Sequence, residues 1–375
     1  MRRPDALQSG ESERLDTLAD GRVLPLIFLG PSLSRARAKE LCRGEYRPPI
    51  QRGDLPRFAG GGPRLIGIVD GVFHQSLTVS PNEILTAMED GHQLFGAASM
   101  GALRAVELTQ AGMIGIGRVY EAFATGQTER DDEVAVVFDP RTGHPLSEAL
   151  IGMRVSLQEA MLRGLFSEGE AHEAIQIAEE IHYPLRTYPY LLERLGLPYP
   201  RREEVLRFLR EEATDLKAED ARALLRHISC LAGGDDDSRP TPSRRPPFTK
   251  MAPRSNPPPR HPALEKLKPA PKVAGWTSVR AVPAAETNAV LARVSSRFGV
   301  TRVAEITQLD RLGVPCYSAI WPGTGISAYS GKALDRIEAR VGAQMEALEA
   351  ALSQDDTGVQ VLRARYEQVA KAARP

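Results

Sequence analysis

The chain has 375 residues, and its 42% hydrophobic content is enough to build two domains with at least one sizeable core. Its 48 lysines and arginines balance its 48 aspartates and glutamates, so no overall charge draws it to nucleic acid or to an anionic membrane. The three cysteines lie far apart without a CxxC pair, which argues against a disulfide framework or a structural zinc site and indicates a reducing cytoplasm. We find no signal-peptide pattern and no apolar run long enough to span a membrane.

The first part of the chain alternates predicted strands with predicted helices. Residues 1–22 are charged and unpatterned, and we expect a disordered leader there. Short apolar runs that end in turn residues predict buried strands at 23–30, 65–70 and 93–97. Helices are expected between and after them, at 34–43, 81–90 and 99–110. This alternation predicts an α/β fold with a mostly parallel, doubly wound sheet, whose ligands bind beyond the carboxyl ends of its strands.

The remaining chain changes character twice. Apolar residues at three- and four-residue steps from 146 to 231 predict a helical appendage, so the first domain is expected to span 23–232. Residues 233–276 are expected to be a disordered linker, because eleven of the 29 prolines lie between 233 and 272. The pattern of the last part, 277–375, predicts an α+β fold. Its expected order is a helix at 285–298, a mixed segment at 300–306, a strand at 314–320, turns at 323–331 and a long helix at 332–352.

The stretch Gly96–Arg104 is the most informative for function. Ser99 lies between an expected strand end and a helix start, and Gly101 follows two residues later. In one interpretation Ser99 is an N-cap, whose hydroxyl accepts a hydrogen bond from the first helical turn and contributes about 1 kcal/mol. In the other it is a nucleophile, placed where helix amides stabilise an oxyanion. The usual G-x-S-x-G pattern has glycine where this chain has Ala97, so both interpretations stay open.

Other polar residues fall near the same edge of the predicted sheet. Asp70 ends the second predicted strand, and it is either a turn residue or a second catalytic carboxylate. Arg104 and Glu107 are three apart on one helix and are expected to pair. The acidic run Asp131–Glu133, with Asp132 at its centre, is expected in a solvated loop unless it holds a cation or relays a proton. The candidate general bases are His74, His92 and His144, and the sequence does not choose among them.

Ordered motifs over about 150 residues resemble TfuA-like proteins. They are Phe28–Leu33, Gly53–Asp54, Ile68–Phe73, Glu83–Leu85, Gly96–Arg104, Glu107–Leu108, Gly112–Met113 and Asp131–Ala135. The resemblance implies an accessory protein that works with YcaO enzymes to make thioamides in the backbone of ribosomally made, bacteriocin-type peptides. It implies that sulfide is released or delivered, for example by hydrolysis of a thiocarboxylated sulfur-carrier protein, with no cofactor in this domain. Such hydrolysis suits Ser99, and the further catalytic candidates are Asp70, Arg104 and Asp132.

The C-terminal part resembles the beginning of a YcaO domain, which gives an expected partial domain at 277–375. The matching motifs are Gly299–Ala304, Leu309–Pro315, Ser330–Lys332, Ala339–Arg340 and Met345–Glu349, with Thr277–Thr287 as the lead-in. YcaO domains bind ATP and Mg²⁺ and phosphorylate a backbone amide oxygen. The resemblance therefore implies Lys332 as a phosphate contact and Glu346 and Glu349 as magnesium ligands.

Three positions depart from the YcaO pattern. Serine, glycine and arginine are usual where this chain has Gly342, Ala333 and Trp321. The resemblance also ends about a third of the way through such a domain, at Pro375. Two glutamates are too few ligands for magnesium and a triphosphate. We therefore expect ATP and Mg²⁺ to be used only if another chain completes this part.

The function expected from these observations is a cytoplasmic accessory protein for YcaO-dependent thioamidation. Its expected partners are a YcaO enzyme, a sulfur-carrier protein and a precursor peptide, with no nucleic acid and no membrane. Two alternatives remain. The chain could be a non-catalytic docking module that binds a YcaO enzyme or a sulfur carrier, or it could be a generic serine hydrolase with an unassigned base.

Overall fold

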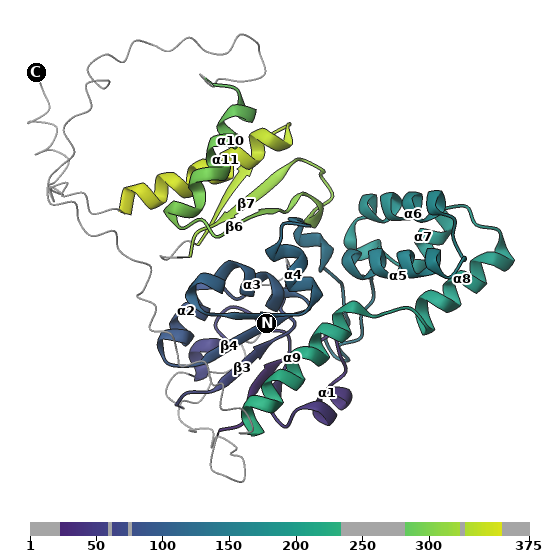
Figure 1. The fold of residues 1–375 in the computed structure, drawn as a ribbon, viewed down its shortest axis with the longest axis horizontal. Coiled ribbons are helices and arrows are strands. Elements are labelled where there is room, and N and C mark those ends of the chain that lie inside the picture. Colours follow the sequence, from purple (N-terminus) through teal and green to yellow (C-terminus); the bar gives the residue numbers. More distant parts are fainter. Residues whose placement is uncertain (1–22, 59–61, 74–76, 234–281, 323–326, 355–375) are drawn as a thin grey trace, which may run out of the picture.

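A five-stranded parallel sheet forms the centre of the N-terminal part of the molecule (Figure 1). The computed structural model describes residues 23–58, 62–73, 77–233, 282–322 and 327–354. The strands are β1 (Leu26–Phe28), β2 (Glu45–Arg47), β3 (Leu65–Ile68), β4 (Gln93–Ala97) and β5 (Ile114–Ile116). Their order is β2-β1-β3-β4-β5, and every neighbouring pair is parallel. The predicted α/β class with a mostly parallel, doubly wound sheet is confirmed.

Helices cover both faces of this sheet. Strand β1 alternates between the faces, as a strand must. Leu26 and Phe28 pack in the same cluster as residues of α2 (Pro81–Glu89) and α3 (Met100–Leu108). Ile27 packs in the opposite cluster, with α1 (Arg35–Leu41) and α9 (Leu216–Gly233). Helix α4 (Arg118–Ala124) follows β5 and packs against α3 and α9.

Two edge strands were not predicted. Strand β2 has the sequence Glu-Tyr-Arg and β5 has Ile-Gly-Ile, and both are three residues long and only half-buried. The β2 run is polar, and the apolar run of β5 is short and interrupted by Gly115, so neither stands out as β1, β3 and β4 do. The expected leader at 1–22 and almost all of the expected linker at 233–276 lie outside the described residues.

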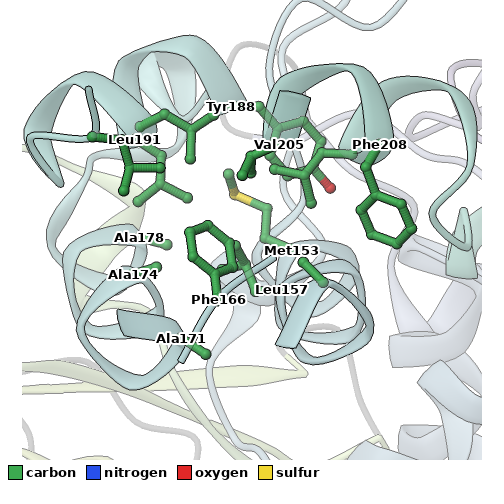
Figure 2. Close-up of a cluster of buried hydrophobic side chains, with 14 of the residues drawn as sticks. Met153, Leu157, Phe166, Ala171, Ala174, Ala178, Tyr188, Leu191, Val205 and Phe208 are labelled. Carbon is green, nitrogen blue, oxygen red and sulfur yellow. The ribbon is translucent and has the colours of Figure 1, made fainter. Parts of the chain in front are cut away.

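Within the predicted helical appendage at 146–231, four helices share a core of their own (Figure 2). They are α5 (Leu150–Leu162), α6 (Glu168–Glu180), α7 (Tyr188–Arg194) and α8 (Tyr199–Glu211). Met153 and Leu157 of α5 meet Phe166, Leu191 and Val205 there. The appendage is an insertion, because the chain leaves the sheet after α4 and returns to it as α9.

Residues 282–322 and 327–354 form a second, smaller α+β unit, which we call the C-terminal unit. It contains α10 (Ala284–Val294), the antiparallel strands β6 (Arg302–Glu305), β7 (Cys316–Ile320) and β8 (Ala328–Lys332), and α11 (Arg336–Gln354). The expectation of turns through 331 is wrong, because residues 328–332 pair with β7. Gly331 of β8 lies directly under α11, where a Cβ would come within 2.0 Å of the Ala339 carbonyl oxygen.

Short 3-10 helices connect several of these elements, at Leu55–Phe58, Thr109–Ala111, Asp131–Glu133, Tyr183–Leu185, Ser295–Phe298 and Thr307–Leu309. Within the residues that the structure describes, no helix combines the length and the apolar character needed to cross a membrane.

Candidate functional site

The strand order creates a topological switch between β1 and β3, because the chain leaves β1 toward β2 and then returns to the other side. In open parallel sheets, ligands bind outside the carboxyl ends of the strands at such a point. Asp70 follows β3 there and is almost fully buried. Its carboxylate accepts hydrogen bonds from the Gly30 and Ser32 amides at 2.8 and 3.1 Å and from the Ser32 hydroxyl at 2.6 Å. Asp70 therefore holds together the two loops that border the switch point.

Ser99 lies at the same edge, after an unusual turn. Among the described residues, Ala98 is the one non-glycine with a positive φ, at 62°. The Ser99 amide donates to the Ala97 carbonyl at 2.7 Å, which closes a γ-turn of the rare, strained kind around Ala98. Ser99 is 3% exposed, and its side chain makes no capping hydrogen bond to α3. The N-cap interpretation therefore does not account for Ser99.

Two glycines bring this turn against β3. A Cβ on Gly101 would lie 1.7 Å from the Ile68 carbonyl oxygen, and a Cβ on Gly96 would lie 2.0 Å from the Gly101 carbonyl oxygen. The Gly101 amide also reaches the Val69 carbonyl, at 3.3 Å. The glycine two residues after Ser99 is thus required for close packing of α3 on the sheet, and the same packing sets Ser99 beside the strand end that carries Asp70.

Lys217, which the sequence interpretation missed, is buried near these residues. Its neighbours Leu216 and Ala218 belong to the packed clusters that contain Ala102 and Ala98, on either side of Ser99. The Lys217 ammonium donates to the Val134 carbonyl at 3.2 Å. Burial lowers the pKa of Lys217, while the negative charge of Asp70, and further those of Asp215 and Glu148, act in the opposite direction. A buried amine with a lowered pKa can accept a proton near neutral pH.

The sequence did contain a signal for Lys217. On α9 it shares one helical face with Ala221, Leu224 and Ile228, which follow at four-, seven- and eleven-residue steps and all pack against the sheet. A lysine on the apolar face of a helix is a candidate for a buried, functional amine. The pattern around Ser99 does not point to Lys217, because this lysine lies 118 positions farther along the chain.

A second polar cluster lies on α3 and the loops beside it. Arg104 and Glu107 form the expected ion pair, and the Arg104 Nε also donates to the Val79 carbonyl at 3.0 Å. Both residues are buried. Arg302 of the C-terminal unit joins them, with its Nη1 3.1 Å from the Glu107 Oε1 and its Nη2 bonded to Asp131. The pairing is therefore more than an intrahelical contact, because it connects the two parts of the chain.

The expectation of a solvated acidic loop at 131–133 is wrong. These residues form a 3-10 helix in which Asp132 and Glu133 are 1% exposed. Both carboxylate oxygens of Asp132 bind Arg130 at 2.9 Å, and one also binds Arg186 at 2.7 Å. Burial raises the pKa of Asp132, but Arg130 and then Arg186 outweigh it, so that this pKa lies below its ordinary value. Asp132 thus lies within a buried ion cluster, and its predicted catalytic role stays a prediction.

Of the three candidate histidines, the two that the structure describes, His92 and His144, do not lie at Ser99. His92 precedes β4 and accepts a hydrogen bond from the Arg64 amide at 3.1 Å, at the amino ends of the strands. Strand β4 separates it from Ser99 by five residues, a rise of roughly 17 Å. His144 is exposed on a turn, and His74 lies outside the described residues.

The residues predicted to bind ATP and magnesium lie on the C-terminal unit. Lys332 ends β8, and Glu346 and Glu349 lie on α11; all three are exposed. In the described part of the chain, no group of three or more His, Cys, Asp or Glu side chains is arranged to hold a metal ion. Magnesium requires about six oxygen ligands, so the donors present here do not fit it on their own.

Comparison with known proteins supports the first of the two resemblances. Residues 70–187 match a family model described as TfuA-like protein. A stretch of 73 residues is 45% identical to an uncharacterized protein of Methanothermobacter thermautotrophicus and covers 19% of this chain and 19% of that protein. The chain thus matches about a fifth of the length of that relative. The family match includes Asp70, Ser99, Arg104 and Asp132. The YcaO-like resemblance of residues 277–375 stays a prediction.

Proposed function

We propose that this chain is an accessory protein for YcaO-dependent thioamidation of a ribosomally made peptide, and that its TfuA-like part, residues 23–232, releases the sulfide. The family match over residues 70–187 supports the accessory role. The observation that carries the sulfide-releasing role is Ser99, set on a strained turn at the start of α3, at the edge that holds Asp70 and the buried amine of Lys217.

The proposed reaction is hydrolysis of a thiocarboxylate on a sulfur-carrier protein. The Ser99 oxygen attacks the thiocarboxylate carbon to form a tetrahedral intermediate, and the carbon–sulfur bond breaks when this intermediate collapses to the ester. The hydroxyl proton passes to the neutral amine of Lys217 and from there to the sulfur, which leaves as HS⁻. Water then hydrolyses the resulting ester, which yields the carrier carboxylate and a proton and restores the serine. The N-terminal end of α3 stabilises the negative oxygen in both steps.

Replacing Ser99 tests this assignment. We expect Ser99→Ala to reduce sulfide release from a thiocarboxylated carrier by about 10³-fold or more, because the covalent route is lost. Sulfide is measured by a colorimetric assay on purified full-length protein. Ser34→Ala serves as the control, since it removes an exposed N-cap hydroxyl of α1. Equal turnover by the Ser99→Ala and Ser34→Ala variants would remove Ser99 from the mechanism.

Lys217 gives a separate prediction for the pH dependence. Burial lowers the pKa of Lys217, so the amine loses its proton at a lower pH than an exposed lysine does. Sulfide release should therefore rise with pH and level off below the ordinary lysine pKa of about 10.4. Lys217→Arg keeps the positive charge but cannot give up its proton. We expect this variant to be inactive at every pH tested, whereas Lys39→Arg, on an exposed part of α1, should match the wild type.

A second candidate function, a non-catalytic docking module, is favoured by burial at the site. Ser99 is 3% exposed, and the Asp70 carboxylate already binds Gly30 and Ser32. Thioamide formation in a reconstituted system, with a YcaO enzyme, a sulfur carrier and a precursor peptide, separates the two functions. If Ser99→Ala supports wild-type thioamide formation, the docking role holds; if it supports none, the enzymatic role holds. ATP and Mg²⁺ belong to this proposal only through a chain that completes the YcaO-like part.

A further inference from the structure

The side chain of Arg302 lies in a pocket of the segment that matches the family model, residues 70–187, which we call the TfuA-like segment. The walls are the carboxylates of Glu107 and Asp131 and the ring face of Phe123, whose centroid lies 5.2 Å from the guanidinium carbon. The Arg302 side chain is 6% exposed and that of Glu107 is 1% exposed. All three wall residues lie within residues 70–187, whereas Arg302 comes from the C-terminal unit. The pocket therefore joins two regions of the chain that lie far apart in the sequence.

The charges of the pocket require a cation. Glu107 and Asp131 supply two carboxylates, and Arg104 balances one of them. Burial raises the pKa of Asp131, and the neighbouring Arg302 is the strongest influence in the opposite direction. Without Arg302, one buried negative charge would have no partner. A buried charge without a partner is strongly unfavourable, so an empty pocket would attract a cationic group.

The shape of the pocket selects a guanidinium over an ammonium group. Two nitrogens of Arg302 donate to two different carboxylates, while the guanidinium carbon lies over the Phe123 ring. A planar fork of donors makes these contacts together, and a guanidinium stacks on aromatic rings. Lysine has a single charged nitrogen on a flexible stem and cannot make both carboxylate contacts and the ring contact together.

Backbone contacts fix the segment that carries the arginine. Three residues after Arg302, the Glu305 amide donates to the Glu129 carbonyl at 2.8 Å, and Glu305 forms a parallel β-bridge with Arg130. Arg340 of α11 pairs with the Glu129 carboxylate at the margin of the contact. The TfuA-like segment thus contacts Arg302–Glu305 through one backbone hydrogen bond and one isolated β-bridge, and it binds the Arg302 side chain between two carboxylates and a ring. Figure 1 shows the C-terminal unit lying beside α3 and α4 as a result.

We propose that Glu107, Asp131 and Phe123 form a guanidinium-binding site, which in this chain takes the arginine of the extended segment Arg302–Glu305 and thereby docks the C-terminal unit on the TfuA-like segment. The site is independent of sulfide release. Failure of the thiocarboxylate assay would leave it unchanged.

Amide exchange in the full-length protein, followed residue by residue by NMR, tests the site. The Glu305 amide reports docking, because it bonds across the contact, and the amides of the β7–β8 ladder report whether the C-terminal unit is folded. In Arg302→Ala we expect the Glu305 amide to exchange at least about tenfold faster, because loss of the Arg302 contacts makes local opening of this segment more frequent. Exchange of the ladder amides should be unchanged. Arg297→Ala, an exposed arginine of the same unit, should leave both reporters at their wild-type rates.

Chemical rescue then identifies the ligand class. Millimolar methylguanidinium should restore slow exchange at Glu305 in Arg302→Ala, and methylammonium should not. Arg302→Lys should exchange as fast as Arg302→Ala. If Arg302→Ala also loosens the ladder, restoration of both reporters by methylguanidinium still supports the site. Wild-type protection in Arg302→Lys, or equal rescue by the two cations, or no rescue by methylguanidinium, contradicts it.

Discussion

Gly101→Ala should leave the chain without a cooperatively folded parallel-sheet domain. The added Cβ would stand 1.7 Å from the Ile68 carbonyl oxygen and 2.6 Å from its carbon. Both atoms belong to the backbone of the central strand β3, so no side chain can rotate away. Ordinary overpacking costs about 1–3 kcal/mol, and a clash with a strand that is paired on both sides exceeds that range. Urea unfolding followed by circular dichroism measures the effect.

Gly152→Ala is the matched control for this prediction. Gly152 lies inside α5, and a Cβ built on it meets nothing within 4 Å. Alanine in a helix interior is more favourable than glycine, so this variant should gain about 0.5–1 kcal/mol. If Gly101→Ala unfolded at the same urea concentration as the wild type, the close packing of α3 on β3 would be wrong.

Asp132→Asn should cost about 3–5 kcal/mol of unfolding free energy at pH 7, because it removes the carboxylate that balances the buried guanidinium of Arg186 and the partly buried one of Arg130. Arg186 is fully buried, and within the described part of the chain Asp132 is the one carboxylate to which it donates. The amide of asparagine can still accept one hydrogen bond but carries no charge. The comparison uses urea unfolding of the wild type and the variant over a series of pH values.

The sign of the pH dependence follows from the lowered pKa of Asp132. A carboxylate with a lowered pKa in the folded state contributes full stability above its unfolded value of about 3.9, and loses that contribution as the pH falls through the folded value. The difference between the wild type and Asp132→Asn should therefore be constant near neutral pH and shrink below about pH 4. A difference that stays the same down to pH 2 would contradict this account.

An exposed ion pair supplies the control for Asp132→Asn. Glu40 pairs with Arg37 on the surface of α1, where both side chains are more than half exposed. Surface pairs of this kind contribute about 0.2–0.5 kcal/mol, so Glu40→Gln should be nearly neutral at every pH. The contrast separates the effect of burial from the effect of removing any carboxylate.

The sequence was sufficient to predict the parts of the fold in which local pattern decides structure. Strands β1, β3 and β4 were visible because each is an apolar run that ends at a turn residue, and Asp70 and Ser99 were placed at the carboxyl edge by the same reasoning. The edge strand β2 was not visible, because its pairing with β1 is set by the sheet and its own residues are polar.

The residues around the site depend on contacts between distant segments, which local pattern does not contain. Asp132 appeared solvated because its partner Arg186 lies 54 positions away. The Arg104–Glu107 pair appeared to be an ordinary helix contact, because Arg302 lies 195 positions beyond Glu107. In both cases the sequence pattern singled out the acidic residue but not the distant arginine that pairs with it.

The position of α9 has a consequence for synthesis of the protein. This helix covers one face of the sheet, yet it begins one hundred residues after β5 ends, beyond the whole of the α5–α8 insertion. On the ribosome, β1, β3 and β4 emerge long before α9. Ile27 and Phe95, which pack against α9 in the folded protein, therefore lack this helix while the insertion is translated. Nascent chains that stop before residue 216 would expose this apolar face, and they are the species that a chaperone should bind.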